Sequence, residues 1–258
     1  MSIGVVYRAD ATNVGDWYCS PARYFTLRYP EQADIMALDL DRLAPDVLVG
    51  GGGLLAKTFH PFLRALAERR PKLRSLAAWG LGESENVDRS GGSAPPYAGP
   101  DPDYLSAFDL IGVRDYGTPH VWAPCASCMH PSLDRPYEIT RELCIYEHKR
   151  IRIPIEGLPR RSNDGNDIDA TLAWLGSTQV VITNSYHGAY WATLLGRRVV
   201  AIANMSKLYR LKHPPVICRA GDWKRYVDLA APYPDALAEC RAATAAFHDR
   251  VTRLQAAE

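Results

Sequence analysis

Short runs of apolar residues, each ending at glycines or small polar residues, recur along the whole chain. Runs rich in valine, isoleucine and leucine are typical of strands that are buried on both faces of a parallel sheet. The runs predict strands at residues 3–7, 46–49, 76–79, 110–113, 143–146, 179–183, 198–202 and 216–218. Between most of these strands, apolar residues recur at the helical spacing of three and four.

The helical spacing predicts helices from about Trp17, then at 58–70, 103–108 and 167–175, from just after Ser185 to 195, and at 234–255. Strands that alternate with helices predict an α/β fold with parallel sheets. We expect two doubly wound, Rossmann-like domains, residues 1–135 and 136–258, that face one another across a cleft. No strict internal repeat is visible. Residues 83–102 are rich in proline, glycine and acidic residues, which predicts a lid, an acceptor-contact loop or a disordered segment.

The stretch from 177 to 202 carries the strongest candidate for chemistry. A β-branched strand ends at Asn184 and Ser185, which are typical helix-capping residues, so His187 is predicted to lie near the amino end of a helix. In open α/β sheets, ligands bind beside the carboxyl ends of strands, and a helix amino end there favours an anion. An imidazole in that place can donate a proton. The alternative is a histidine that simply packs against the sheet.

Other strand ends also carry candidate residues. Asn13, Gly15 and Asp16 follow the first strand, where Asp16 can orient a hydroxyl or, alternatively, cap a helix. Gly52 and Gly53 belong to a four-glycine loop that lets a ligand approach the backbone, although its spacing fits neither a Walker loop nor a dinucleotide fingerprint. Arg114 follows the strand at 110–113 and can clamp a carboxylate or phosphate. Its alternatives are a structural pair with Asp115 and a solvated surface arginine.

Two basic clusters and one cysteine pair complete the candidates. Residues 148–152 form the first cluster, and Lys207 and Arg210 belong to the second, at 207–213. Both clusters can help to hold an anion, or they are solvated surface charges. Cys125, Cys128 and His130 have a spacing that suits up to three metal ligands, but no second pair completes a zinc site. Buried thiols are the alternative, and we expect no bound metal.

Composition narrows the function classes. The hydrophobic content of 47% and charged content of 23% are ordinary for a globular protein. A formal net charge of +1 gives no electrostatic reason to expect nucleic acid as a partner. No apolar run is long enough to span a membrane, and the amino terminus does not resemble a signal peptide. Six cysteines without an export signal are expected to be reduced thiols in a cytoplasmic protein.

Taken in order, these motifs resemble those of the polysaccharide pyruvyl transferase family. The matching pieces run from Asn13 to about Ile202 and are 13–16, 51–54, 80–82, Val113-Arg114-Asp115 with Thr118, and 183–188 followed by 196–202. One position departs from the family pattern. Many members carry an arginine two residues before the histidine, and here that residue is Ser185.

The resemblance implies a fold similar to that of B-type glycosyltransferases and the transfer of a pyruvyl group from phosphoenolpyruvate to a saccharide. By the same resemblance, His187 and Arg114 are catalytic, the acceptor can be lipid-linked, and the protein can contact the inner membrane face. No cofactor is expected, because phosphoenolpyruvate is itself the donor substrate. A homo-oligomer is compatible with this reading. Two alternatives stay open: a glycosyltransferase that uses a nucleotide sugar, and a non-catalytic protein that binds a sugar or an anion.

Overall fold

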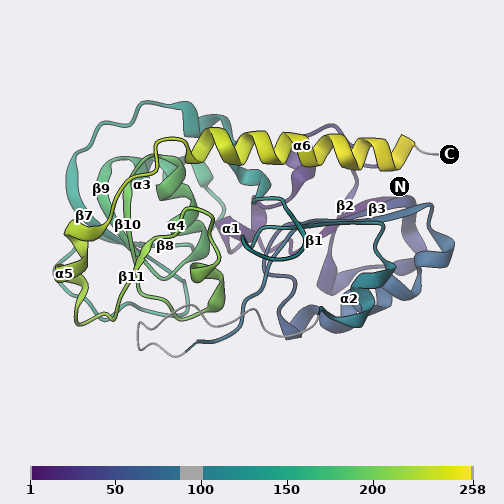
Figure 1. Cartoon of the computed structure of the whole chain (residues 1–258), viewed down its shortest axis with the longest axis horizontal. Coiled ribbons are helices and arrows are strands. Elements are labelled where there is room, and N and C mark those ends of the chain that lie inside the picture. The colour runs from purple at the N-terminus through teal and green to yellow at the C-terminus, as the bar shows by residue number, and fades with distance from the viewer. Residues whose placement is uncertain (1, 88–100, 257–258) are drawn as a thin grey trace.

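The computed structural model of the chain describes residues 2–87 and 101–256, whose strands form two parallel sheets (Figure 1). The first sheet contains β1 (Ile3–Tyr7), β2 (Gln32–Asp34), β3 (Leu43–Gly50), β4 (Ser75–Leu81), β5 (Leu110–Val113) and β6 (Val121–Trp122). The second contains β7 (Arg141–Glu147), β8 (Arg160–Ser162), β9 (Thr178–Thr183), β10 (Arg198–Ala201) and β11 (Val216–Ile217). Two parallel sheets confirm the expected α/β class. The division into two domains stays a prediction.

Both sheets follow the same winding. The strand order is β2-β1-β3-β4-β5-β6 in the first sheet and β8-β7-β9-β10-β11 in the second. In each sheet the chain runs from the first strand to one edge and then returns to the opposite side of that first strand. The order of the winding therefore reverses beside β1 and beside β7. Ligands of doubly wound sheets bind at such a switch point, outside the carboxyl ends of the strands.

The helices are α1 (Val14–Trp17), α2 (His60–Glu68), α3 (Ile168–Gly176), α4 (Tyr186–Leu194), α5 (Trp223–Tyr226) and α6 (Ala236–Ala256). Asn13 caps α1, because its side chain accepts a hydrogen bond from Gly15 N. The expectation of a helix from about Trp17 was therefore wrong, since α1 ends there. Residues 103–107 form a 3₁₀ helix in place of the α-helix expected over 103–108. Most of the predicted loop, residues 88–100, lies outside the described residues.

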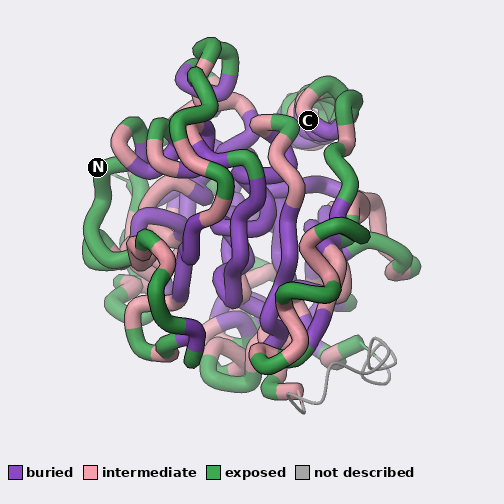
Figure 2. Tube along the Cα trace, turned by 90° about the vertical axis from the view of Figure 1, so that its left-hand side faces the viewer, coloured by how far each residue is buried: buried purple, intermediate pink, exposed green. Residues whose placement is uncertain are grey.

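Apolar side chains cover both faces of both sheets, and buried strands run through the middle of the molecule (Figure 2). This double burial is why the strands read as continuous apolar runs. Helix α4 lies so deep that all nine of its residues are buried. A helix in that position needs apolar residues around its whole circumference, as the sequence provides.

Helix α6 runs along both sheets (Figure 1). Near its start Cys240 joins the core that contains α4, and further along Phe247 packs on Trp79 of β4, with ring centroids 5.2 Å apart. Towards its end, Gln255 O accepts a hydrogen bond from Arg28 Nη1 at 2.9 Å. The helix follows the second sheet in the sequence, yet most of its length packs against the first. It therefore ties the two sheets together.

Candidate functional site

A cavity of about 180 Å³ lies where the two switch points meet. Its walls come from loops that follow strands β1, β3, β4 and β5 of the first sheet and β7, β8, β9 and β10 of the second. The lining residues are Arg8, Asn13, Asp16, Gly53, Leu54, Ala56, Phe59, Ser84, Arg114, His148, Asn163, Ser185, Tyr186, His187, Met205 and Lys207. The topology thus brings together residues that are far apart in the sequence.

The amino end of α4 forms one wall of the cavity. Ser185 caps this helix by accepting a hydrogen bond from Gly188 N at 3.3 Å. The neighbouring Asn184 has a structural role, because its side chain accepts a hydrogen bond from His148 N at 2.7 Å and donates one to Ile151 O at 2.9 Å. Ser185 therefore shapes the helix end and supplies no charge to the cavity.

His187 follows in the first turn of α4 and is only 6% exposed. Its ring packs so closely on Gly15 of the first half that a Cβ atom at position 15 would lie 2.0 Å from His187 Nδ1. On the opposite side of the ring, Nε2 lies 3.4 Å from Cys125 Sγ. Burial lowers the pKa of His187 well below its usual value, and the charges of Arg114 and Lys207 lower it further. The imidazole is consequently neutral at pH 7 while the cavity holds no anion.

Arg114 follows β5 and is 3% exposed. Its guanidinium lies over the ring of Tyr186, 3.9 Å from the ring centroid, and so crosses from one half to the other. The nearest oxygen of Asp115 is 4.0 Å from Nε, which is too far for a hydrogen bond. Nε is buried without a hydrogen-bond partner among the described residues. The predicted cation therefore lines the same cavity as His187, and it also forms the structural ion pair with Asp115 that was its alternative role.

Asp16 supplies a carboxylate to the same cavity. Asn13 Nδ2 donates a hydrogen bond to Asp16 Oδ2 at 2.7 Å, while Asn13 Oδ1 accepts one from Asn163 Nδ2 at 2.9 Å. Burial raises the pKa of Asp16, and the charges of Lys207 and Arg114 oppose that shift. A carboxylate with a raised pKa is a stronger base than an exposed one.

Lys207 comes from the segment after β10. Burial lowers its pKa to about 8, and repulsion from Arg114 acts in the same direction. His148 lies after β7 with its pKa lowered to about 4, again chiefly by burial and then by Lys207. Arg8 also lines the cavity, but it pairs with Asp34 and lies 3.9 Å from Asp10. Lys207 and Arg114 therefore carry most of the positive charge that a ligand would meet.

Backbone pairing joins the two halves on both flanks of the cavity. On one flank Val14 N donates to Asn163 O at 3.2 Å, and Gly165 N donates to Thr12 O at 3.3 Å. On the other flank Val87 N donates to Asn204 O at 3.2 Å, and Ser206 N donates to Glu85 O at 2.8 Å. These two sets of bonds, which we call the flanking bridges, hold the opposite walls in register.

Four of the predicted substrate-binding residues are not among those that line the cavity: Gly15, Gly52, Asn184 and Arg210. Gly15 packs on the ring of His187 instead. Gly52 faces Cys19, whose Sγ would be 3.7 Å from a Cβ at position 52. Asn184 holds the turn after β7, as described above. Arg210 lies beyond the cavity wall, where its carbonyl accepts a hydrogen bond from Tyr116 N at 2.8 Å.

Other lining residues were missed by sequence reasoning. Arg8, Ser84 and Asn163 each follow a strand, so position after a strand end was the available signal. For Asn163 that signal was hidden, because β8 has only three residues, all of them polar. The basic cluster at 148–152 separates: His148 lines the cavity, whereas Lys149 Nζ bonds Thr12 O at 2.6 Å and Arg152 pairs with Glu156.

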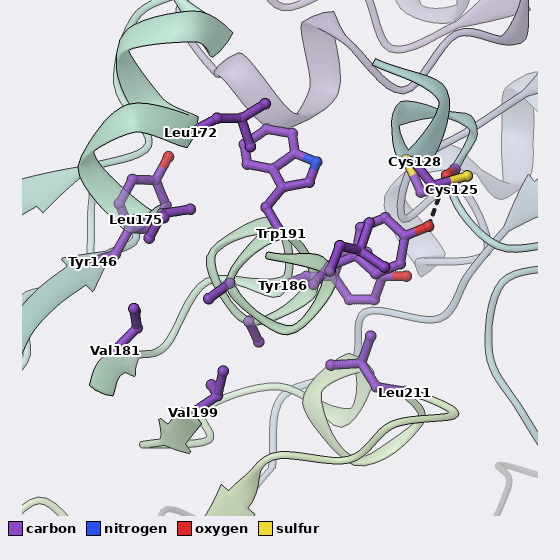
Figure 3. Close-up of a cluster of buried hydrophobic side chains, with 14 of the residues drawn as sticks. Cys125, Cys128, Tyr146, Leu172, Leu175, Val181, Tyr186, Trp191, Val199 and Leu211 are labelled. Atoms are coloured by element: carbon purple, nitrogen blue, oxygen red, sulfur yellow. Dashed lines mark hydrogen bonds between the residues drawn. The ribbon is translucent and has the colours of Figure 1, made fainter. Parts of the chain in front are cut away.

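The cysteine-containing segment after β6 packs against α4 (Figure 3). Cys125 faces His187, Cys128 Sγ lies 3.3 Å from Thr244 Oγ1, and His130 Nδ1 accepts a hydrogen bond from Ser132 N at 3.3 Å. Each of the three side chains therefore contacts a different neighbour. Within residues 2–87 and 101–256, no group of three or more His, Cys, Asp or Glu residues has the arrangement of a metal site.

No protein-family model and no curated protein matches the chain. One solved structure, of a functionally uncharacterized protein from Klebsiella pneumoniae, aligns with a TM-score of 0.49 and 15% identity over 78% of this chain and 83% of that chain. This similarity is too low to say anything about function. In the described part of the chain, no helix has both the length and the apolar character to cross a bilayer.

Proposed function

We propose that the protein transfers the pyruvyl group of phosphoenolpyruvate to a saccharide and forms a ketal with two of its hydroxyl groups. The observation that carries the proposal is the meeting of Arg114, Lys207 and the amino end of α4 around one small cavity. Phosphoenolpyruvate has a phosphate and a carboxylate, so its site needs several cationic or N–H contacts. The family resemblance and the two similarly wound sheets, an arrangement akin to B-type glycosyltransferases, support the same reading.

The reaction assigns a role to each group. One hydroxyl oxygen of the saccharide bonds to the central carbon of the donor while a proton is added to the methylene carbon. The second hydroxyl oxygen then bonds to the same carbon, inorganic phosphate leaves, and the remaining hydroxyl proton leaves with it. Asp16 receives a proton from an acceptor hydroxyl, and Arg114 with Lys207 neutralises the donor.

His187 is the proposed proton donor to the methylene carbon. It is neutral in the empty cavity, because burial and two nearby cations lower its pKa. A bound anion with two or more negative charges offsets those cations and raises the pKa of the imidazole again. Donor binding thereby leads to protonation of His187. Without the donor, the imidazole carries no additional proton that could be transferred to water.

The size of the cavity favours this donor over a nucleotide sugar. Sites for drug-sized ligands usually enclose about 300–1,000 Å³, whereas this cavity has about 180 Å³. A three-carbon phosphate ester suits the smaller volume.

Titration calorimetry with phosphoenolpyruvate, inorganic phosphate, pyruvate and UDP-glucose tests the donor. Phosphoenolpyruvate should bind more tightly than phosphate or pyruvate, because it alone presents both anionic groups. Arg114→Ala should weaken it by roughly ten- to a hundredfold, since a hydrogen bond to a charged group contributes about 1.5–3 kcal/mol. The control Lys224→Ala removes the same charge from an exposed position and should leave binding unchanged.

Turnover is then followed as phosphate released from phosphoenolpyruvate, or nucleotide released from UDP-glucose, in the presence of saccharide acceptors. If the protein binds UDP-glucose and releases nucleotide from it, but does not bind phosphoenolpyruvate, the protein is a glycosyltransferase and the proposal is wrong. Binding of phosphoenolpyruvate without phosphate release over a panel of acceptors would leave only an anion-binding protein.

A further inference from the structure

Cys125 faces the catalytic candidate from the side away from the cavity. It belongs to the segment after β6, is fully buried, and places Sγ 3.4 Å from His187 Nε2. Cys125 does not line the cavity, so it cannot contact a ligand there. Its effect on any reaction would have to pass through the imidazole.

The thiol is part of a short buried chain of hydrogen bonds. Trp191 Nε1, which can only donate, bonds Ser127 Oγ at 2.9 Å. Ser127 Oγ in turn lies 3.1 Å from Cys125 Sγ. Tyr190 also holds this segment, because its hydroxyl donates to Cys125 O at 2.9 Å. Figure 3 shows Trp191 and the two cysteines of this segment.

The direction of the chain follows from counting hydrogens. Trp191 supplies one hydrogen to Ser127 Oγ, and Ser127 is fully buried, so its own hydroxyl hydrogen needs an acceptor. Cys125 Sγ is the neighbour within reach. The thiol then has its own hydrogen left to donate, and His187 Nε2 is the acceptor beside it. With the opposite direction, the serine hydroxyl hydrogen would be buried without a partner.

We propose that Cys125 is a positioning residue that donates a hydrogen bond to His187 Nε2 and so fixes the neutral imidazole with its hydrogen on Nδ1. The hydrogen bond made by one ring nitrogen of a histidine determines which nitrogen is protonated. Nδ1 lies on the side of Gly15, between the cavity residues Asn13 and Asp16 in the sequence. The neutral ring therefore turns its N–H group towards the turn of the first half that carries Gly15.

This inference deepens the proposed function and rests on it only for its catalytic consequence. Burial raises the pKa of the Cys125 thiol, so the sulfur keeps its hydrogen at neutral pH. The thiol comes from the first half of the chain and the imidazole from the second. The correct tautomer is therefore available only while the two halves are docked.

The test is the long-range ¹H–¹⁵N spectrum of protein labelled at histidine nitrogens, with His187 assigned by the signal missing in His187→Gln. The wild-type protein at pH 7.5 should show His187 protonated on Nδ1 and bare at Nε2. A signal from the Nε2–H tautomer in the wild type would overturn the inference, and this measurement needs no variant at Cys125.

Variants then identify the donor. Cys125→Ala should produce a mixture of tautomers, whereas Cys125→Ser keeps a donor and should preserve the Nδ1–H form. Cys128→Ala is the matched control, since it removes a buried thiol from the same segment that bonds Thr244 instead. An unchanged His187 signal in folded Cys125→Ala would refute the role of the thiol.

Turnover gives a separate readout. Cys125→Ala should lower kcat for phosphoenolpyruvate roughly ten- to a hundredfold, the range seen when a partner that orients a metal-binding histidine is removed. KM should change little, and Cys125→Ser should recover most of the loss. If Cys125→Ala shows mixed tautomers of His187 but a normal kcat, the tautomer does not affect catalysis, and the proposed catalytic role of Cys125 is wrong. A protein that never turns over phosphoenolpyruvate would refute the proposed function, while the spectrum still decides the tautomer.

Discussion

At the scale of single residues, the cavity changes the properties that its side chains would have in water. Burial and neighbouring charge lower the pKa of both His187 and Lys207, the latter to about 8. Burial raises the pKa of Asp16, against the opposing effect of the charges of Lys207 and Arg114. An anionic ligand would raise the pKa of His187 and of Lys207, and would thus partly reverse both of these shifts. Ligand binding and proton uptake are consequently linked at this site.

The first residue-scale prediction concerns His187. His187→Gln should reduce turnover by roughly a hundred- to ten-thousandfold, the usual contribution of a positioned proton donor. The dissociation constant for phosphoenolpyruvate should change much less, because Arg114 and Lys207 remain. Phosphate release and calorimetry measure the two effects. His130→Gln, a change away from the cavity, should leave both near normal, and unimpaired turnover in His187→Gln would remove His187 from the mechanism.

Lys207 gives a prediction for pH dependence. Its pKa of about 8 means that the ammonium form is present below pH 8 and is lost as the pH rises above that value. Because an anion binds the charged form, the dissociation constant for phosphoenolpyruvate should rise towards tenfold per pH unit between pH 8 and the pKa of the bound state. Calorimetry from pH 7 to 10 measures it.

A matched variant isolates the ammonium group. Lys207→Arg should remove the alkaline loss of affinity, since a guanidinium stays charged up to about pH 12. Lys207→Met should bind phosphoenolpyruvate weakly at every pH, and its affinity should not fall further as the pH rises. A wild-type affinity that is flat from pH 7 to 10 would mean that Lys207 does not meet the ligand.

At the scale of elements, a short helix and a buried helix meet across the two halves. Helix α1 brings Gly15 against the ring of His187 on α4, and β5 brings Arg114 over the ring of Tyr186 on the same helix. A side chain at Gly82 would collide with Arg114, because a Cβ there would lie 2.2 Å from Nε. Glycines at these strand ends therefore make room for the functional side chains.

Gly15→Ala tests this close approach. The added methyl group would lie 2.0 Å from His187 Nδ1, so the ring or α1 must move. We expect a fall in phosphoenolpyruvate turnover of at least about a hundredfold, as is seen when catalytic groups are misplaced by an ångström or so. Gly221→Ala is the control, because nothing lies within 4 Å of its new Cβ. Equal activity in the two variants would contradict the geometry.

Sequence patterns predicted the elements that are long and strongly apolar. The stretch around α4 was predicted to within a residue or two, because Asn184, Ser185 and Gly196 mark its ends. The patterns missed β2, β6 and β8, which have three, two and three residues and few apolar positions. They also could not identify Cys125 as the neighbour of His187, since that contact depends on how the two sheets dock.

The cavity was partly predictable for the same reason. His187, Arg114, Asp16, Asn13, Gly53, Ser185 and Lys207 follow strands that could be recognised, and all of them line it. Arg210 and Asn184 were grouped with them by nearness in sequence alone. Only the packing distinguishes a side chain that faces the cavity from a neighbour that holds the backbone.

At the scale of the whole molecule, two sheets with the same winding are joined by helix α6 and by the flanking bridges. The repetition lies in strand order and was invisible in the residues themselves. Since α6 packs on both sheets, loosening one half removes contacts from the other. We therefore expect that neither half unfolds while the other stays folded.

Phe247→Ala tests the contribution of α6. Phe247 is 1% exposed and packs against Trp79, so its removal should destabilise the protein by about 3–5 kcal/mol. The melting temperature, followed by calorimetry, should fall by roughly 2–4 °C for each kcal/mol lost. Arg250→Ala, an exposed change on the same helix, should shift it very little. An unshifted Phe247→Ala would show that α6 does not hold the halves together.

Gly15 of the first half packs on His187 of the second half. The catalytic activity therefore reports whether the two halves are docked. Each half keeps its own strands and helices if the seam between them widens, yet the imidazole, the guanidinium and the carboxylate no longer share one space. Phosphate release in mild urea is therefore expected to fade before the circular dichroism of the helices does. If the two signals have the same urea midpoint, the contacts between the halves are lost only when the sheets themselves unfold.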